Sequence, residues 1–278
     1  MRFELHCHSH YSRGKKIPWE AFMSPREIIK TARLKGIFGV AITDHDDSRA
    51  WKEAKRAARE YGLIFIPSME INTRKGHLIG LGLNEHIDRD LGLQETIENI
   101  HEQGALAIAP HPFDLRSHGI KNGVYYVDAV EVFNSMNLDK LSNRLAFNKA
   151  EEFGRPMVVG SDSHSEEMFG LAVNEINAYD LDSALKEIKA GRVEFQTDYM
   201  PLSVLMDWAK ERFTRSYMEV MKYINHNYSP PRAWVAKGML RRYVLSKNRT
   251  WDGFWKLLGN FGLGCSMVYG GMRFLTYY

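Results

Sequence analysis

The sequence predicts an α/β protein in which parallel strands form a barrel that helices cover. Along residues 1–200, short apolar or β-branched runs alternate with amphipathic stretches of helical length, as is typical of a parallel sheet with crossover helices. Segments that contain histidine or carboxylate residues directly follow five of the later apolar runs. The carboxyl ends of barrel strands share one face, and that face carries the chemistry of such folds.

Eight apolar runs have the length and composition of strands. Aliphatic and β-branched residues dominate them, and glycine, proline or polar residues bound most of them. We expect strands at residues 2–6, 38–43, 63–67, 77–82, 105–109, 127–132, 156–160 and 173–178.

Helix signals lie between these runs. Ser24 followed by Pro25 is typical of a helix start, and a glycine closes each expected helix. We expect helices at residues 24–36 and 47–62, two more that end at residues 104 and 154, and a last one at 181–190.

The distribution of charge divides the chain near residue 200. Residues 1–200 hold 25 Lys and Arg against 30 Asp and Glu, whereas residues 201–278 hold 12 against 4. Ten of the eleven histidines also precede residue 165. We therefore expect a barrel domain over residues 1–200 and a basic, aromatic-rich helical extension over residues 201–278.

Cysteine usage and the amino terminus bear on the cellular compartment. Cys7 and Cys265 are too isolated to form a disulfide framework, and the chain enters its first expected strand without a basic and apolar leader. We therefore expect a cytoplasmic protein.

Several residues at the expected strand ends are potential metal ligands. His6 and His8 lie two residues apart on a strand, so both point to the same face, where two imidazoles can bind one ion. His77 begins its strand, and it joins the site if residues 70–83 form a hairpin. The candidate ligands are His6, His8, His45, Glu70, His77, His111, Asp162 and His164.

Each candidate taken alone could be a helix cap or an ordinary loop residue. That interpretation does not explain why six histidines and two carboxylates lie together at one rim. Burying so many polar groups without compensation would cost several kcal/mol. A metal site is the interpretation that accounts for the whole cluster.

Five segments occur in the order of a known family. They are residues 6–12 (HCHSHYS), 43–46 (TDHD), 68–70 (SME), 110–112 (PHP) and 160–164 (GSDSH). Together they resemble the polymerase and histidinol phosphatase (PHP) domain over roughly residues 1–195. The resemblance implies a distorted (β/α)7 barrel of the PHP type. It also implies two or three divalent metal ions at the rim, for which this ligand set admits zinc, manganese or iron.

The resemblance also implies how the ligands divide. The family usually supplies a further ligand, for a third metal ion, at the positions that Ser12, Arg13 and Gly14 occupy in this chain. Arginine cannot bind a metal. His10 is a nearby replacement, and we expect nearer two ions than three. The resemblance assigns His6, His8, Glu70 and Asp162 to one ion, Glu70, His77 and His111 to a second, and His45 and His164 to a third.

A carboxylate-bridged pair of ions suits hydrolysis of a phosphate ester. Such a pair lowers the pKa of a shared water and stabilises the leaving oxygen. The resemblance indicates the same metal-dependent phosphoesterase activity. Arg13, Arg116 and His118 are the expected phosphate-binding residues. Nucleotides, oligonucleotides and small phosphorylated metabolites all remain open as substrates.

Two other classes of function remain open. Amidohydrolases also place histidines and an aspartate on a barrel rim, but they often bridge their metals with a modified lysine. A non-catalytic PHP-like nucleic-acid binding module is the second alternative, against which eight retained candidate ligands argue. Metal-dependent phosphate release distinguishes the phosphoesterase from both.

The extension carries no metal-ligand pattern. Residues 208–213 and 233–242 are expected helices, separated by a break at Pro230 and Pro231. They could pack on the barrel, lie peripherally on an anionic membrane surface, or contact nucleic acid. The uncharged run at 257–272 is shorter than the roughly 20 apolar residues that a spanning helix requires.

Overall fold

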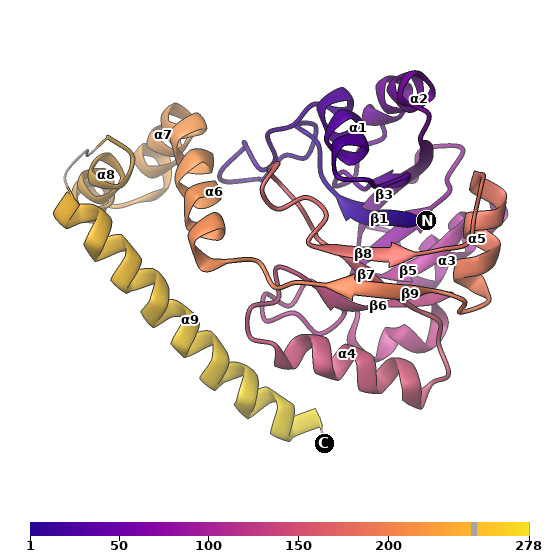
Figure 1. The fold of residues 1–278 in the computed structure, drawn as a ribbon. Helices are drawn as coiled ribbons and strands as arrows, with labels where there is room; N and C mark the ends of the chain where they lie inside the picture. The colour runs from indigo at the N-terminus through magenta and orange to yellow at the C-terminus, as the bar shows by residue number, and fades with distance from the viewer. Residues whose placement is uncertain (246–248, 278) are drawn as a thin grey trace.

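A computed structural model describes residues 1–245 and 249–277 (Figure 1). Within them, nine strands form one sheet in the order β7-β6-β5-β4-β3-β2-β1-β8-β9. The strands are β1 (Arg2–Cys7), β2 (Gly39–Ile42), β3 (Ile64–Thr73), β4 (Gly76–Leu81), β5 (Leu106–Ala109), β6 (Ala129–Asn134), β7 (Met157–Gly160), β8 (Ala172–Glu175) and β9 (Glu194–Thr197).

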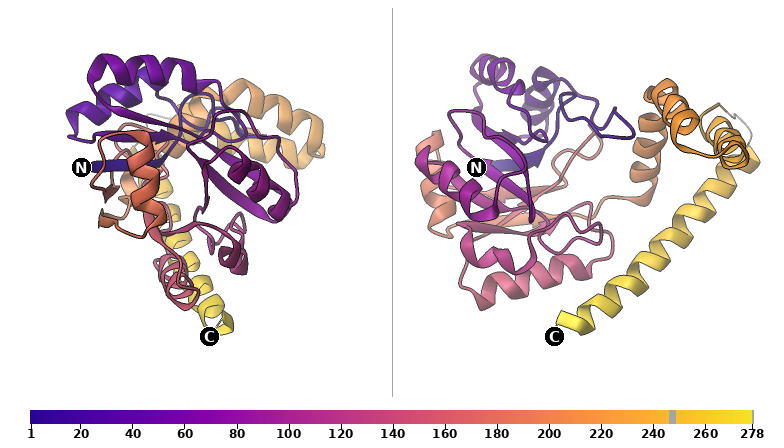
Figure 2. Two further views of the ribbon diagram at one scale, coloured as in Figure 1. Left: turned by 90° about the vertical axis from the view of Figure 1, so that its right-hand side faces the viewer. Right: turned by 180° about the vertical axis from the view of Figure 1, so that it is seen from behind.

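Helices follow most strands and cover the outside of the sheet (Figures 1 and 2). Those of the barrel are α1 (Pro25–Leu34), α2 (Ala50–Tyr61), α3 (Leu93–Glu102), a 3-10 helix (Lys121–Tyr126), α4 (Leu141–Glu152) and α5 (Leu181–Lys189). The chain continues as α6 (Leu202–Arg215), α7 (Tyr217–Asn227), α8 (Pro230–Leu245) and α9 (Arg249–Tyr277).

The expected strands and helices of the barrel are all present, with shifted ends. β3 continues to Thr73 instead of ending near residue 67, because it turns directly into β4 and pairs with it. β9 was not expected. Its residues are all exposed and include Glu194 and Gln196, so the segment lacks an apolar run.

The sheet curls until its first and seventh strands meet. β1, β2 and β3 are parallel, as are β5, β6 and β7, whereas β4 is antiparallel to both of its neighbours. The chain beyond β7 pairs with the end of β1, where Asp162 N donates to His6 O and His8 N donates to Ser163 O, both at 2.9 Å. The result is a nearly closed barrel, to which β8 and β9 are added beside β1.

One side chain fills the gap between β7 and β8. The Asn174 amide donates to Val159 O at 2.7 Å and accepts from Val159 N at 2.9 Å. These two bonds take the place of the ladder that a neighbouring strand would provide. Asn174 and Val159 are both fully buried, so water cannot replace Asn174 as the hydrogen-bond partner of the Val159 backbone.

Apolar helix faces hold the helices on the barrel. Ile28 and Ile29 of α1 and Ala54 and Ala57 of α2 pack in one buried cluster with Val40 of β2. α1 begins at a capping box, in which Ser24 Oγ accepts from Glu27 N while the Glu27 carboxylate accepts from Ser24 N. This packing fixes the strand ends that carry the polar segments.

The C-terminal helices form a separate layer beside the barrel mouth (Figure 2). Trp208 Nε1 of α6 donates to Glu20 O at 2.8 Å, and Arg212 pairs with the Glu20 carboxylate at 3.0 Å. α9 then returns alongside α6 to α4. Pro230 begins α8 instead of only breaking the chain, because proline fits the first turn of a helix. No helix of the described residues is long and apolar enough to cross a membrane.

Candidate metal centre

β1 brings two imidazoles to the mouth of the barrel. His6 and His8 alternate with Cys7, so both face the same side, and their Nε2 atoms lie 3.3 Å apart. Both rings are almost completely buried. The two histidines therefore point to the same face of the strand, as predicted.

Glu70 lies at the centre of the cluster, and its two oxygens face different histidines. Oε2 is 3.3 Å from Nε2 of His6 and of His8. Oε1 is 2.6 Å from His77 Nδ1 and 3.0 Å from His111 Nε2. A carboxylate with ligand nitrogens on both sides can bridge two ions.

The β3–β4 hairpin brings the His77 ring to the Glu70 carboxylate. Asn72 and His77 are partners in the antiparallel ladder, which brings His77 back to the mouth although it lies near the start of its strand. Asp46 holds the hairpin, because its carboxylate accepts from the backbone N and from the side-chain Nδ2 of Asn72, both at 2.8 Å. The expected hairpin is present.

Barrel closure brings Asp162 to the cluster. Asp162 Oδ1 lies 3.5 Å from His6 Nε2 and 3.2 Å from His8 Nε2. Asp162 and His111 both have positive φ, at 51° and 28°, although neither is glycine. Strained backbone of this kind concentrates at functional sites, where the surrounding structure holds it in place.

His45 and His164 lie on either side of His8. Their ring centroids are 4.7 Å and 4.5 Å from that of His8, and both pairs are stacked. The third nitrogen of this group thus comes from His8, whereas His10 packs against Tyr11. The suggestion that His10 completes this group is not what the geometry shows.

The donor set fits divalent metal ions. Among the described residues, His45 Nδ1 is buried without a hydrogen-bond partner while it lies 3.3 Å from Glu70 Oε2. Imidazole and carboxylate together suit zinc, manganese and iron. In the described part of the chain, four groups have ligand atoms within 4.8 Å of one another: His8, His45 and His164; His6, His8 and Glu70; His6, His111 and Asp162; and His45, Glu70 and His77.

Glu131 orients His6 and was not among the candidates. His6 Nδ1 donates to Glu131 Oε1 at 2.8 Å, which turns His6 Nε2 toward the cluster, and His111 N donates to Oε2 at 2.7 Å. Any side chain at Gly160 would approach Glu131 Oε1 to 2.1 Å. The sequence shows a carboxylate near a strand end, but only barrel closure shows that it lies beside His6.

A second chain of hydrogen bonds orients His8. Its Nδ1 lies 2.9 Å from Ser12 Oγ, which donates to Asp44 Oδ1 at 3.1 Å. Asp44 also accepts from Ser9 N at 2.6 Å. Such outer partners fix the tautomer and orientation of a ligating histidine, leaving Nε2 free to bind.

Charges within the cluster shift its pKa values. Burial disfavours the ionised form of Glu70, but His45, His77 and His6 outweigh this effect and hold its pKa well below the usual range. Burial, reinforced by the charge of the neighbouring His8, lowers the pKa of His45 and of His164 to about 3. Those two imidazoles are therefore neutral at physiological pH and ready to bind a metal.

Two of the three expected phosphate-binding residues border the cluster. Arg116 Nη2 lies 3.8 Å from Asp162 Oδ2, and His118 stacks on His77 with ring centroids 4.9 Å apart. Arg13 instead stacks its guanidinium on Trp19 at 4.0 Å and is exposed. Arg116 and His118 thus lie beside the cluster, and phosphate binding by Arg13 stays a prediction.

Comparison with known proteins identifies the family. A family model described as PHP-associated matches residues 140–193. The uncharacterized protein MJ1587 of Methanocaldococcus jannaschii is 43% identical over 156 residues, which are 54% of this chain and 91% of that protein. The chain belongs to the PHP family.

Two other matches are more distant. A 5'-3' exoribonuclease of Haemophilus influenzae is 30% identical over 125 residues, which are 44% of this PHP chain and 42% of that protein. The crystal structure of PsfC from Pseudomonas syringae aligns with a TM-score of 0.56 at 15% identity, over 76% of this chain and 97% of that one. The PHP chain shares its fold with PsfC.

Proposed function

We propose that this protein hydrolyses a phosphate ester with two or three divalent metal ions, of zinc, manganese or iron, bound in the histidine cluster. The observation that supports this most strongly is the position of Glu70, whose two oxygens face two separate pairs of histidine nitrogens. Family membership supports the same chemistry. The proposed ligands are His6, His8, His45, Glu70, His77, His111, Asp162 and His164.

The side chains around the cluster would prepare the substrate for attack. Bound ions would supply a water of lowered pKa and neutralise the charge that develops on the phosphate. Arg116, anchored by Asp114 at 3.3 Å, can donate hydrogen bonds to phosphate oxygens. Trp208 packs beside His164, with ring centroids 5.3 Å apart, and excludes water from that side.

The substrate class remains part of the proposal. The exoribonuclease relative acts on RNA by its name, so nucleotides and oligonucleotides should be tested together with small phosphorylated metabolites. We also propose a boundary near residue 200, with the barrel over 1–200 and the helical extension over 201–278. It falls between the end of β9 at Thr197 and the start of α6 at Leu202.

The direct experiment measures phosphate release from p-nitrophenyl phosphate after loading with manganese, zinc or iron. Glu70→Gln keeps the shape of the side chain but removes the bridging charge, so we expect at least a thousandfold loss of kcat. The exposed Glu98→Gln on α3 is the control and should leave turnover unchanged. Near-normal turnover by Glu70→Gln would contradict the proposed site, and cleavage of an amide but no phosphate ester would favour an amidohydrolase.

A further inference from the structure

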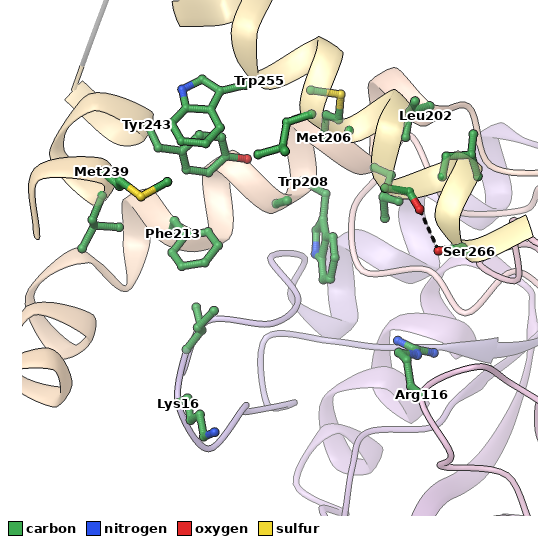
Figure 3. A pocket seen from close by; sticks show the side chains of 18 of the residues that line it. Lys16, Arg116, Leu202, Met206, Trp208, Phe213, Met239, Tyr243, Trp255 and Ser266 are labelled. Carbon is green, nitrogen blue, oxygen red and sulfur yellow. Dashed lines mark hydrogen bonds between the residues drawn. The ribbon is translucent and has the colours of Figure 1, made fainter. Parts of the chain in front are cut away.

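A large apolar cavity lies between the C-terminal helices and the loops at the barrel mouth (Figure 3). Its volume of about 870 Å³ lies within the roughly 300–1,000 Å³ typical of small-molecule sites. Aliphatic and aromatic side chains of α6 to α9 form most of its wall, among them Leu202, Met206, Phe213, Met239, Tyr243 and Leu263.

Two residues connect this cavity to the metal centre. Arg116 lines the cavity and also reaches to 3.8 Å from Asp162 Oδ2. Trp208 lines it too, and its ring lies beside that of His164. The cavity therefore borders the ligand cluster.

Apolar side chains dominate the described wall, and several of its polar side chains are already engaged. Ser266 Oγ donates to Gly262 O at 3.0 Å, Asn137 Nδ2 donates to Asn143 Oδ1 at 2.9 Å, and Asp139 Oδ1 accepts from Ser142 N at 2.7 Å. A polar ligand group that is buried against the apolar part of the wall without a hydrogen bond costs kilocalories per group. A hydrocarbon chain has no such requirement.

We propose that the substrate is a phosphate ester of a long-chain alcohol, with its hydrocarbon chain in this cavity and its phosphate beside Arg116 at the metal centre. The proposal rests on the phosphoesterase function proposed above. In the reaction, a water oxygen bonds to phosphorus and the ester P–O bond breaks. The alcohol oxygen takes a proton from that water, and the products are the free alcohol and inorganic phosphate.

The outer side of α9 suggests where such a substrate is met. Leu257, Phe261 and Val268 are about two-thirds exposed, at 70%, 69% and 66%. The same helix contributes Leu258 and Leu263 to the cavity wall. A helix with apolar residues on both sides can lie at a lipid surface and pass a chain inward.

The first test compares alkyl phosphates from ethyl to dodecyl, below their micellar concentrations, with p-nitrophenyl phosphate as the reference. Each buried methylene can improve binding by up to about fourfold. We expect kcat/KM to rise at least tenfold from ethyl to dodecyl phosphate. Activity that is independent of chain length would overturn the long-chain substrate. Absence of activity on every phosphate ester, including the aryl ester, would overturn the phosphoesterase function instead.

Two glycines of α9 provide a matched pair of variants. A Cβ added at Gly262 or at Gly264 meets no atom within 4 Å, but only Gly262 belongs to the cavity wall. Gly262→Phe should lower kcat/KM for dodecyl phosphate at least tenfold more than it lowers kcat/KM for the aryl ester. Gly264→Phe should affect neither. Equal effects of the two variants, or an equal loss on both substrates, would contradict occupancy of the cavity by the chain.

Binding can be followed without turnover. Dodecylphosphonate, which lacks a cleavable ester bond, should alter tryptophan fluorescence because Trp208 and Trp255 line the cavity, and Gly262→Phe should weaken its binding at least tenfold. Methylphosphonate should cause no such change. The same long-chain phosphate presented in vesicles or as monomers then distinguishes a membrane source from a dissolved one. Equal binding of the two phosphonates would exclude a hydrocarbon site.

Discussion

The orientation of His6 depends on one carboxylate. Glu131 accepts from His6 Nδ1 at 2.8 Å and is buried with it. Loss of such a partner typically reduces metal affinity or activity by 10- to 100-fold. We expect Glu131→Ala to show this loss in a metal titration, with a smaller loss for Glu131→Gln. Asp128→Asn, which removes a carboxylate bound to His101 instead, should leave metal affinity unchanged.

The protonation of His8 predicts how metal binding depends on pH. Burial disfavours its charged form, but hydrogen bonds to Asp162 and Glu70 outweigh this and raise its pKa to about 9. Only neutral imidazole binds a metal, so His8 must release a proton at pH 7. Affinity should rise between pH 6 and about 9 and then level off.

Calorimetry in buffers of different ionisation enthalpy measures this release. We expect the apparent binding enthalpy at pH 7 to vary linearly with the buffer enthalpy, with a slope of at least one proton per chain. His45 and His164 should add nothing, because their pKa values lie near 3. A slope of zero would show that His8 is neutral before the metal binds.

Among the elements, β8 is joined to β7 through the side chain of Asn174. Asn174 satisfies both backbone groups of Val159, and each unsatisfied buried group costs about 1–3 kcal/mol. Asn174→Leu should therefore lower the free energy of unfolding by roughly 2 kcal/mol or more. Urea denaturation measures this loss. Asn227→Ala removes an exposed hydrogen bond, from the Asn227 side-chain amide to Tyr223 O in α7, and should change stability little.

The sequence predicted the elements of the barrel better than their connections. Alternation of apolar runs with helix signals was sufficient for β1 to β8 and for α1 to α5. β9 has no apolar pattern, and its pairing with β8 is visible only in three dimensions. The role of Asn174 was hidden for the same reason, since a lone asparagine in a strand looks unfavourable until its strand neighbours are known.

The candidate site was predicted to a similar extent. Strand ends indicated seven of the eight candidate ligands, because parallel strands must bring their ends together. His77 required the hairpin, and the length of β3 could not be read beyond Pro67. Glu131 was missed because the closing contact of β1 with β7 places it beside His6. Arg13 was assigned to phosphate from its position in the chain, whereas Trp19 holds its guanidinium.

At the scale of the whole molecule, the helical extension carries positive charge. Residues 201–278 hold 12 Lys and Arg against 4 Asp and Glu. Binding to vesicles with anionic lipids should therefore weaken as salt rises. Replacing both Arg232 and Arg241 by Glu on α8 should reduce vesicle binding by at least about thirtyfold, because each basic residue near an anionic surface contributes about 1 kcal/mol.

Lys30 and Arg33 of α1 provide the control for that experiment. Both are exposed, and their replacement by Glu changes the net charge of the protein by the same amount. This variant should bind vesicles nearly as the unchanged protein does. If only an oligonucleotide bound, and the α8 variant abolished that binding, the extension would be a nucleic-acid contact instead. If the protein bound neither vesicles nor an oligonucleotide at low salt, the extension would only pack on the barrel.

The cavity could not be predicted from the sequence. Its wall combines α6, α7 and α8 with α9, and the return of α9 toward α4 depends on long-range packing. The expected helices at residues 208–213 and 233–242 lie within α6 and α8. Their apolar faces indicated a packed surface, but the sequence did not indicate that this surface encloses a space beside the metal centre.

Anomalous diffraction from manganese-soaked crystals would show whether Glu70 bridges two metal ions, as we propose. We expect two peaks, one between Glu70 Oε2 and the pair His6 and His8, the other between Glu70 Oε1 and the pair His77 and His111. A third, weaker peak beside His45 would be compatible with it. A single peak, or two peaks neither of which contacts Glu70, would contradict it.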